Sequence, residues 1–363
     1  MELKIIKLPF NIRKSVLALG SQTKNTVCFA KGKSAYVSLA HADLGNLADF
    51  SQFEKSVKYF LKKRPAVIAC DLHLEYSSSK FARECVSKDQ RVRVSEAQHH
   101  HAHIASCMAE NGLKNQKVIG VAFDGTGMGS DNTLWGAEFL ICDYKNFTRP
   151  AHLKEVALIG GEKAILEPWR LLAALKLDMP KGIEKKQWQL VKDMQKKGFN
   201  APVASSMGRL FDAAASLVLG KYRAEFEAQL AIELERLAFS FEPKTKSYKF
   251  KIRKEKDTYI IDPAPMLREI VKDLKQGESK PEIAYRFHLT VAEMIRKVCV
   301  ILRKKYKINK VVLSGGVFQN NLILRLGLGL LYEEGFKVFI PKQLSCNDSG
   351  ISLGQAMIAA SRS

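Results

Sequence analysis

The sequence predicts an α/β protein with two lobes. Its 363 residues are more than one compact core of ordinary size holds, so a division into two lobes is expected. Short apolar segments with strand character alternate with amphipathic helical segments along the chain. Three of the apolar segments run into glycine-containing turns. The composition, with 46% hydrophobic and 26% charged residues, is typical of a globular protein.

The first lobe is expected to span residues 1–134. Its strands are placed at 16–19, 26–30, 35–39, 66–70 and 118–123, and its helices at 48–62 and 97–110. A turn at 31–33, which contains Gly32, would separate the second strand from the third. This order of strands and helices matches a ribonuclease-H-like lobe.

The second lobe is expected to span residues 135–363. Strands are predicted at 135–141, 310–316 and 337–340, followed by a C-terminal helix from residue 349. Helical segments and a basic hairpin lie between the first two of these strands and are interpreted as insertions. The similarity between the two halves is one of element order, because no sequence repeat of short period is visible.

The formal net charge of +21 allows binding to nucleic acid, an anionic membrane or an acidic partner. Much of the charge lies in two tracts, 181–197 and 244–256. In the second tract apolar and basic residues alternate, which predicts a strand that turns at 254–257 into another strand at 258–261. Such a hairpin could follow a nucleic-acid backbone or form a sheet edge that lysines protect from aggregation. The absence of an RNA-stacking aromatic motif favours the sheet edge.

The cellular setting is expected to be the cytoplasm. The N-terminal residues contain no apolar stretch of signal-peptide length, and no apolar run is long enough for a transmembrane helix. The 7 cysteines are dispersed without a C-x-x-C spacing, which is typical of reduced thiols. No membrane association is therefore expected.

A histidine cluster marks one candidate site. Of the 8 histidines, four occur at 99, 100, 101 and 103. On a helix, His99 and His103 project from the same face, an arrangement that offers two imidazoles to one metal ion. Asp124, at the end of a predicted strand, could add an oxygen ligand. The alternative is a polar helix on the protein surface.

The three glycine-containing turns mark a second candidate site. They lie at 19–21, 123–127 and 313–316, each at the end of a predicted strand. Glycine lets the backbone approach a phosphate closely, and the free N–H groups of such a turn can bind its oxygens. In actin-like ATPases two turns of this kind hold the phosphates. The sequence contains neither a P-loop motif nor a G-x-G-x-x-G motif, which argues against those nucleotide-binding modes.

Several longer motifs carry a family resemblance. They are QHHHAHIASCMAENGL (98–113), VAFDGTGMGSDNTLWGAEF (121–139), EPWR (167–170), SSMGRLFDAAASL (205–217), RFHLT (286–290), LSGGVFQNNLI (313–323) and NDSGISLGQA (347–356). In this order they resemble the C-terminal module of HypF carbamoyltransferases, over nearly the whole chain. That module is more distantly similar to the tRNA threonylcarbamoyl-transferase family. The resemblance implies an actin-like (ASKHA) fold, with two ribonuclease-H-like lobes around a nucleotide cleft.

The resemblance also implies roles for individual residues. The expected ligands of iron or zinc are His99, His103, Asp124 and Asp348. The expected phosphate-binding residues are Lys24, Asn25, Gly125, Thr126 and Gly127, with Lys24 and Asp124 acting in catalysis. The residues expected to hold adenosine are Gly208, Asp212, Glu227, Gly315, Gly316 and Asn320. His73 and His288 receive no role and are interpreted as hydrogen-bonded core histidines.

The implied activity is transfer of a carbamoyl group from carbamoyl-adenylate, made from ATP, to a cysteine thiol. The acceptor would be the C-terminal cysteine of a partner in nickel–iron hydrogenase maturation. HypF chains also carry domains that form the adenylate, and these are absent from the sequence, so a separate adenylate-forming domain is expected as a partner. Ser349 stands where a second glycine is usual. A tRNA threonylcarbamoyl-type transferase, favoured by the charge, and a non-catalytic nucleotide-binding partner protein remain alternatives.

Overall fold

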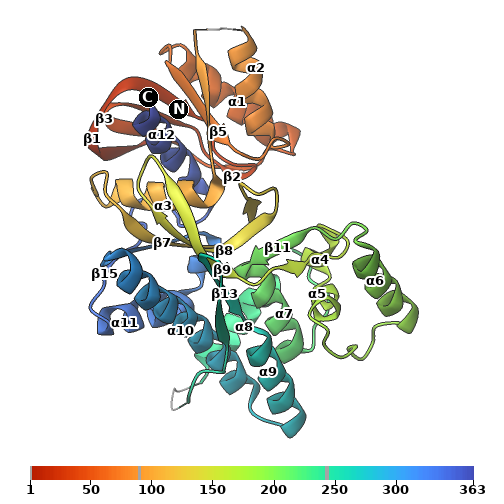
Figure 1. Cartoon of the computed structure of the whole chain (residues 1–363). Coiled ribbons are helices and arrows are strands. Elements are labelled where there is room, and N and C mark those ends of the chain that lie inside the picture. The colour runs from red at the N-terminus through yellow and green to blue at the C-terminus, as the bar shows by residue number, and fades with distance from the viewer. Residues whose placement is uncertain (1, 89–90, 242–244) are drawn as a thin grey trace.

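The computed structural model describes residues 2–88, 91–241 and 245–363. Two sheets lie one above the other in Figure 1, each covered by helices, and α3 lies between them. The described strands form a four-stranded sheet with the order β3-β1-β5-β6 and a nine-stranded sheet whose main path is β12-β13-β9-β8-β7-β14-β15. The protein therefore has an α/β architecture with two sheets.

The first sheet is built on one long antiparallel pair. Its strands are β1 (Leu3–Ala18), β3 (Cys28–Ser38), β5 (Val67–Asp71) and β6 (Arg93–Ala97), and β2 (Thr23–Asn25) pairs separately with β4 (His41–Asp43). The turn expected at 31–33 is wrong, because β3 runs through these residues as one strand. Its partner β1 supplies a continuous antiparallel edge, and Gly32, opposite Ile12, absorbs an irregularity in the pairing with a φ of +62°.

Helices cover both faces of the first sheet. Alternate residues of β1 point to opposite faces, so Leu17 joins the core beneath α1 (Leu47–Leu61) and α2 (Ser77–Lys88). Val16 and Ala18 join the core formed with α3 (His99–Glu110) and α12 (Ile351–Arg362). The last helix of the chain thus returns to the first sheet (Figure 1).

The second sheet is centred on β7. Its strands are β7 (Val118–Met128), β8 (Leu134–Cys142), β9 (Phe147–Leu153), β10 (Val156–Ala157), β11 (Val203–Ser206), β12 (Lys251–Glu255), β13 (Thr258–Asp262), β14 (Lys310–Ser314) and β15 (Lys337–Phe339). The α-helices between β11 and the C-terminal α12 are α7 (Met207–Leu219), α8 (Gln229–Phe239), α9 (Ala264–Gln276), α10 (Lys280–Tyr306) and α11 (Asn321–Glu333). These helices and one face of the sheet share the largest apolar core.

Smaller helices complete the second half. They are α4 (Lys163–Leu166), α5 (Trp169–Ala174), α6 (Lys185–Lys197) and the 3-10 helices η1 (Gly316–Gln319) and η2 (Asp348–Gly350). The basic α6 lies at the outside of the fold (Figure 1). Among the described helices, none combines the length and the apolarity needed to cross a bilayer.

The division between the sheets differs from the expected boundary at residue 134. Strand β7 pairs with β8 and β14, so the second sheet begins at Val118. The segment from Ile351 onward belongs with the first sheet, because α12 packs on α3 and β1. A side chain at Gly354 would place its Cβ 2.9 Å from the Ala102 Cα, so glycine permits this close helix contact.

The predicted basic hairpin forms, but its first strand is shorter than expected: β12 begins at Lys251, and residue 244 of the basic tract lies outside the described residues. Strand β12 pairs antiparallel with β13, and Lys256 adopts a left-handed φ of +53° in the turn between them. β12 is the end strand of the nine-stranded sheet, and its basic side chains Lys251 and Arg253 face solvent. This position agrees with an edge strand protected by lysines.

Candidate functional site

The histidine helix α3 is buried between the two sheets. The Gln98 side chain caps its N-terminus by accepting a hydrogen bond from the His101 backbone N–H. His99, His100 and His101 have no exposed surface, and His103 is 1% exposed. The alternative of a polar surface helix is therefore wrong. Burial of four imidazoles requires polar partners for them.

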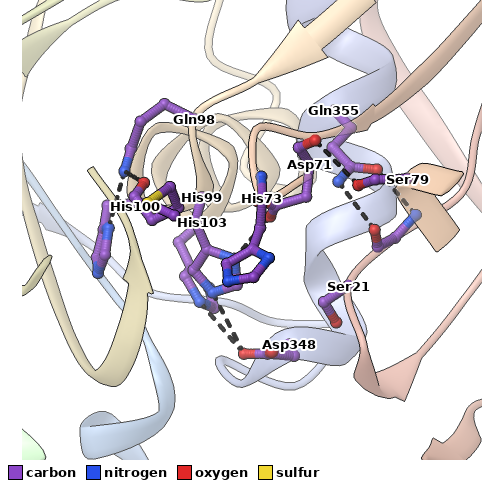
Figure 2. Close-up of polar contacts among 12 residues, drawn as sticks. Ser21, Asp71, His73, Ser79, Gln98, His99, His100, His103, Asp348 and Gln355 are labelled. Carbon is purple, nitrogen blue, oxygen red and sulfur yellow. Dashed lines mark hydrogen bonds and ion pairs between the residues drawn. The ribbon is translucent and has the colours of Figure 1, made fainter. Parts of the chain in front are cut away.

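Two of these imidazoles meet two carboxylates. The Nε2 atom of His103 lies 3.0 Å from Asp124 Oδ2, and that of His99 lies 3.3 Å from the same oxygen. Both Nε2 atoms are 3.6 Å from Asp348 Oδ1. One ligand atom from each of the four residues falls within 4.8 Å of the others. Figure 2 shows both imidazoles extending toward Asp348.

Asp71 orients His99 from behind. Its Oδ2 accepts a hydrogen bond from His99 Nδ1 at 2.8 Å, with both side chains fully buried. This bond directs Nε2 of His99 toward the two carboxylates, as outer carboxylates do for metal-binding histidines. Sequence reasoning missed Asp71, and its position at the end of a buried strand was the available signal.

The electrostatics of the cluster favour a bound cation. Burial opposes a charge on His99, but Asp348 and Asp71 outweigh it and raise the pKa of this imidazole. Burial would also raise the pKa of Asp124, but His103 and His99 lower it well below its usual range. The carboxylates of Asp124 and Asp348 thus need positive charge nearby, which protons or a metal can supply. The donor set of two nitrogens and two carboxylates fits iron or zinc. Metal binding stays a prediction.

The other two histidines of α3 point elsewhere. His100 Nδ1 lies 3.0 Å from the Gln98 amide nitrogen, and burial lowers the pKa of His100 to about 3. His101 Nε2 donates to the Asp143 carbonyl at 2.6 Å, and burial lowers its pKa to about 4. Neither contacts the carboxylate pair, as helical geometry requires for residues on other faces.

Two of the three predicted glycine segments meet at Asp124. The turn expected at 123–127 is wrong, because β7 (Val118–Met128) runs through it with an irregularity in its pairing with β8 between Phe123 and Gly127. Asp124 Oδ1 accepts hydrogen bonds from the backbone N–H groups of Gly125 at 2.8 Å and Gly316 at 3.3 Å. Gly315 has a φ of +107°, a conformation that favours glycine. A Cβ at Gly127 would lie 2.8 Å from ring carbons of both His99 and His100. The glycine segment 124–127 of β7, which includes Thr126, therefore packs directly over the histidine helix.

The first glycine turn is built differently from the expectation. The Asn25 amide donates to the Leu19 carbonyl at 2.7 Å and the Ser21 carbonyl at 2.6 Å, and its oxygen faces His41. The Gln355 amide bonds the Gly20 backbone through both its oxygen and its nitrogen. Asn25 is thus occupied in shaping the turn. Lys24 is exposed, with a φ of +47°.

The first turn touches the segment that carries Asp348. The Thr26 hydroxyl donates to the Ser349 carbonyl at 2.8 Å. Ser349 itself lies in the 3-10 helix η2 (Asp348–Gly350), a conformation open to any residue, so the departure from glycine costs nothing there. Cys346 lies near Asp124. Burial, and to a smaller extent the charge of that carboxylate, raises the pKa of the Cys346 thiol to about 11.

The residues expected to hold adenosine form two groups. Arg209, which sequence reasoning missed, lies between Asp212 and Glu227, with nitrogen–oxygen distances of 2.9 and 3.4 Å. Burial raises the pKa of Asp212 to about 6. The buried Arg209 Nε and Asp212 Oδ2 atoms form the 2.9 Å ion pair, whereas the buried Nη1 atom of Arg209 has no hydrogen-bond partner among the described residues. An unsatisfied donor of this kind suits a polar ligand. A Cβ at Gly208 would lie 2.9 Å from the Gly125 Cα, which brings this group against the glycine segment of β7.

Asn320 lies apart from the acidic group. Its side-chain oxygen caps α11 by accepting from the Ile323 N–H, and its amide nitrogen lies 3.1 Å from His288 Nε2. His288 Nδ1 donates to the Ala284 carbonyl, and burial lowers the pKa of His288 to about 4. His288 is the hydrogen-bonded core histidine that the sequence predicted.

Comparison with protein families decides the classification. Residues 11–110 match the family model described as the HypF Kae1-like domain, and residues 120–355 match the second subdomain of the carbamoyltransferase Kae1-like domain. The chain belongs to the HypF carbamoyltransferase family. The HypF homolog of Cupriavidus necator is 33% identical over 95% of this chain and 91% of its own length. HypF2 of the same organism is 35% identical over 96% of this chain and 47% of its own length.

A solved structure supports the same classification. Full-length HypF in a phosphate- and nucleotide-bound form has a TM-score of 0.92 and 40% identity, and covers 99% of this chain and 57% of that one. The predicted fold is confirmed. This chain spans about half the length of several of its curated HypF relatives. Two tRNA N6-adenosine threonylcarbamoyltransferases match only 22% and 42% of this chain.

Proposed function

We propose that this protein is a metal-dependent carbamoyltransferase that uses carbamoyl-adenylate, made from ATP, as its donor. The observation that carries the proposal is the position of Asp124. One of its oxygens accepts hydrogen bonds from the backbone N–H groups of Gly125 and Gly316, and the other faces His99 and His103. Asp124 thus joins two glycine segments to a metal-type ligand set, an arrangement that suits a mixed anhydride of carbamate and phosphate.

The ligands would be His99, His103, Asp124 and Asp348, and the metal would supply Lewis-acid polarisation of the bound donor. Residues 125–127 of β7, together with exposed Lys24, would bind phosphate, with the Gly125 N–H shared between Asp124 and the donor. Arg209, whose buried Nη1 atom has no hydrogen-bond partner among the described residues, and the Asp212 carboxylate paired with it would bind ribose hydroxyls, with Gly208 and Glu227 beside them. In this assignment Asn25, Gly315 and Asn320 shape the turns and helix ends.

The acceptor would be a thiolate of a partner protein, and we propose a C-terminal cysteine of a hydrogenase-maturation protein. Its sulfur attacks the carbonyl carbon, the carbon–oxygen bond to the phosphate breaks, and AMP leaves. A relay through Cys346 is disfavoured, since its raised thiol pKa leaves little thiolate at neutral pH. We propose a reducing, cytoplasmic setting, which the dispersed cysteines without a C-x-x-C spacing support.

The test supplies carbamoyl-adenylate, with iron or zinc, to the purified chain and a cysteine-terminated peptide. We expect AMP release and a mass gain of one carbamoyl group on the peptide. The His99→Ala/His103→Ala double variant should lose both activity and metal, whereas His100→Ala should keep the metal. A wild-type chain that binds neither metal nor adenylate would contradict the proposal. With ATP and carbamoyl phosphate alone, little adenylate should form until a separate adenylate-forming domain is added.

The basic charge supports a second, weaker candidate, a tRNA-directed transferase. Binding to tRNA with a steep dependence on salt concentration would favour it. The edge position of β12 already gives its lysines and arginines a role in protecting the sheet.

A further inference from the structure

The segment 71–76 borders the histidine–carboxylate cluster and carries a histidine without a role so far. Asp71 Oδ1 accepts a hydrogen bond from the His73 backbone N–H at 2.9 Å, while its Oδ2 holds His99. One buried carboxylate thus positions both residues. In the view of Figure 2 the His73 ring overlaps His99 and His103, and an electrostatic interaction between His73 and His99 places these two rings near each other.

Two contacts orient the His73 ring. It stacks on the Tyr76 ring with centroids 4.2 Å apart and an interplanar angle of 12°. The Glu75 backbone N–H donates to His73 Nδ1 at 3.3 Å. An Nδ1 atom that accepts a hydrogen bond carries no proton, so the neutral ring carries its proton on Nε2. Among the described residues, none is hydrogen-bonded to that Nε2 atom.

The surroundings keep this ring neutral. Partial burial lowers the pKa of His73 and the charge of nearby His99 lowers it further, against the opposite effects of Asp71 and Glu75. Tyr76 lies close enough to His99, Asp71, Asp348 and Asp124 to sense their charges, and burial raises its phenol pKa. A half-buried, neutral N–H donor thus stands next to the cluster.

We propose that His73 Nε2–H donates a hydrogen bond to the carbonyl oxygen of the carbamoyl group during transfer. The proposal rests on the carbamoyltransferase function above and assigns His73 a catalytic role in it. As the nucleophile attacks the carbonyl carbon, this oxygen gains negative charge, and a positioned donor stabilises it more than it stabilises the ground state. Tyr76 acts as a positioning residue through the stacked rings.

The kinetic test compares His73→Leu, which removes the donor, with His73→Gln, whose side-chain N–H reaches a similar position. The measurement is AMP release from carbamoyl-adenylate in zinc-loaded protein, with water as acceptor, so that carbamate and AMP are the products. We expect His73→Leu to lower kcat by about 10²- to 10³-fold with little change in KM. His73→Gln should restore kcat to within about tenfold of wild type. The exposed neighbour Glu75→Gln serves as the matched control and should be unaffected.

Two readouts separate this role from a structural one. Zinc stoichiometry and thermal midpoint should be the same in His73→Leu, His73→Gln and wild type. ¹⁵N-histidine NMR of the zinc-loaded protein at pH 7.5, with His73 assigned from the His73→Gln spectrum, should show the neutral Nε2–H form.

The outcomes distinguish the two proposals. Wild type that releases no AMP overturns the carbamoyltransferase function and the His73 role with it. Active wild type with an equally active His73→Leu variant overturns the His73 role alone. Equal losses in His73→Leu and His73→Gln accompanied by loss of zinc, or an NMR signal for Nδ1–H, also overturn it.

Discussion

Replacement of Asp71 by asparagine should weaken metal binding without touching a proposed ligand. Asp71 uses one oxygen for His99 Nδ1, at 2.8 Å, and the other for the His73 backbone N–H, at 2.9 Å. Both partners are donors, whereas an asparagine side chain has only one acceptor oxygen. Asp71→Asn therefore loses one of the two hydrogen bonds and the negative charge behind His99.

The size of the effect follows from the role of such carboxylates. Loss of an outer partner of a metal-binding histidine costs about 10- to 100-fold in affinity, or about 1.4 to 2.7 kcal/mol. We expect Asp71→Asn near the lower value. Asp71→Ala should lie near the upper one, because it also leaves the His99 Nδ1–H buried without a partner.

The assay is competition for zinc between the protein and a chromophoric chelator at pH 7.5. Glu75→Gln is the control, since Glu75 lies in the same segment and its carboxylate pairs with Lys80 at the surface, at 2.7 Å with both side chains mostly exposed. It should bind zinc like wild type. The reasoning is refuted if Asp71→Asn keeps its native circular dichroism spectrum and binds zinc within twofold of wild type.

Three further changes test the packing and the electrostatics. Gly354→Ala forces a Cβ against the Ala102 backbone and should destabilise the protein by about 3 kcal/mol in urea unfolding; a change below about 0.5 kcal/mol would contradict this close helix contact. Gly127→Ala places a methyl group 2.8 Å from the His99 ring, so zinc stoichiometry should fall while the fold persists; full zinc occupancy would argue against the ligand assignment. Burial raises the pKa of Asp212 to about 6, from about 3.9 in an unfolded chain. Its contribution to stability is therefore fully present below about pH 4 and is lost as the pH rises through 6, about 2–3 kcal/mol in all. The free energies of unfolding of wild type and Asp212→Asn are measured in urea from pH 4 to 7.5. Relative to Asp212→Asn, wild type should lose stability by about this amount as the pH rises. A difference between the two proteins that does not change with pH would show that the raised pKa is wrong.

The sequence by itself determined the α/β class, the ends of some strands, and His99, His103 and Asp124 as candidate ligands. Some strand ends are visible locally because an apolar run stops at glycine, as β14 does before Gly315. The strand end predicted at 123 was wrong, because pairing with β8 carries β7 on to Met128. The pairing of His99 with His103 follows from helical periodicity alone. The basic hairpin at β12 and β13 was also readable, since alternation and turn residues are neighbours in the chain. Asp348 came from the family resemblance.

Only the tertiary structure decided how these parts combine. It brought Asp348 to within 3.6 Å of the histidine Nε2 atoms, although more than two hundred residues separate them in the sequence. It joined 28–38 into one strand, because the long partner β1 pairs with both ends of this strand on either side of an irregularity at Gly32. It returned α12 to the first sheet, where Gly354 admits close contact with α3. It also turned Asn25 inward and brought Asp71 and His73 to the cluster. Contacts of this kind depend on burial and on partners distant in sequence, and local patterns carry no information about either.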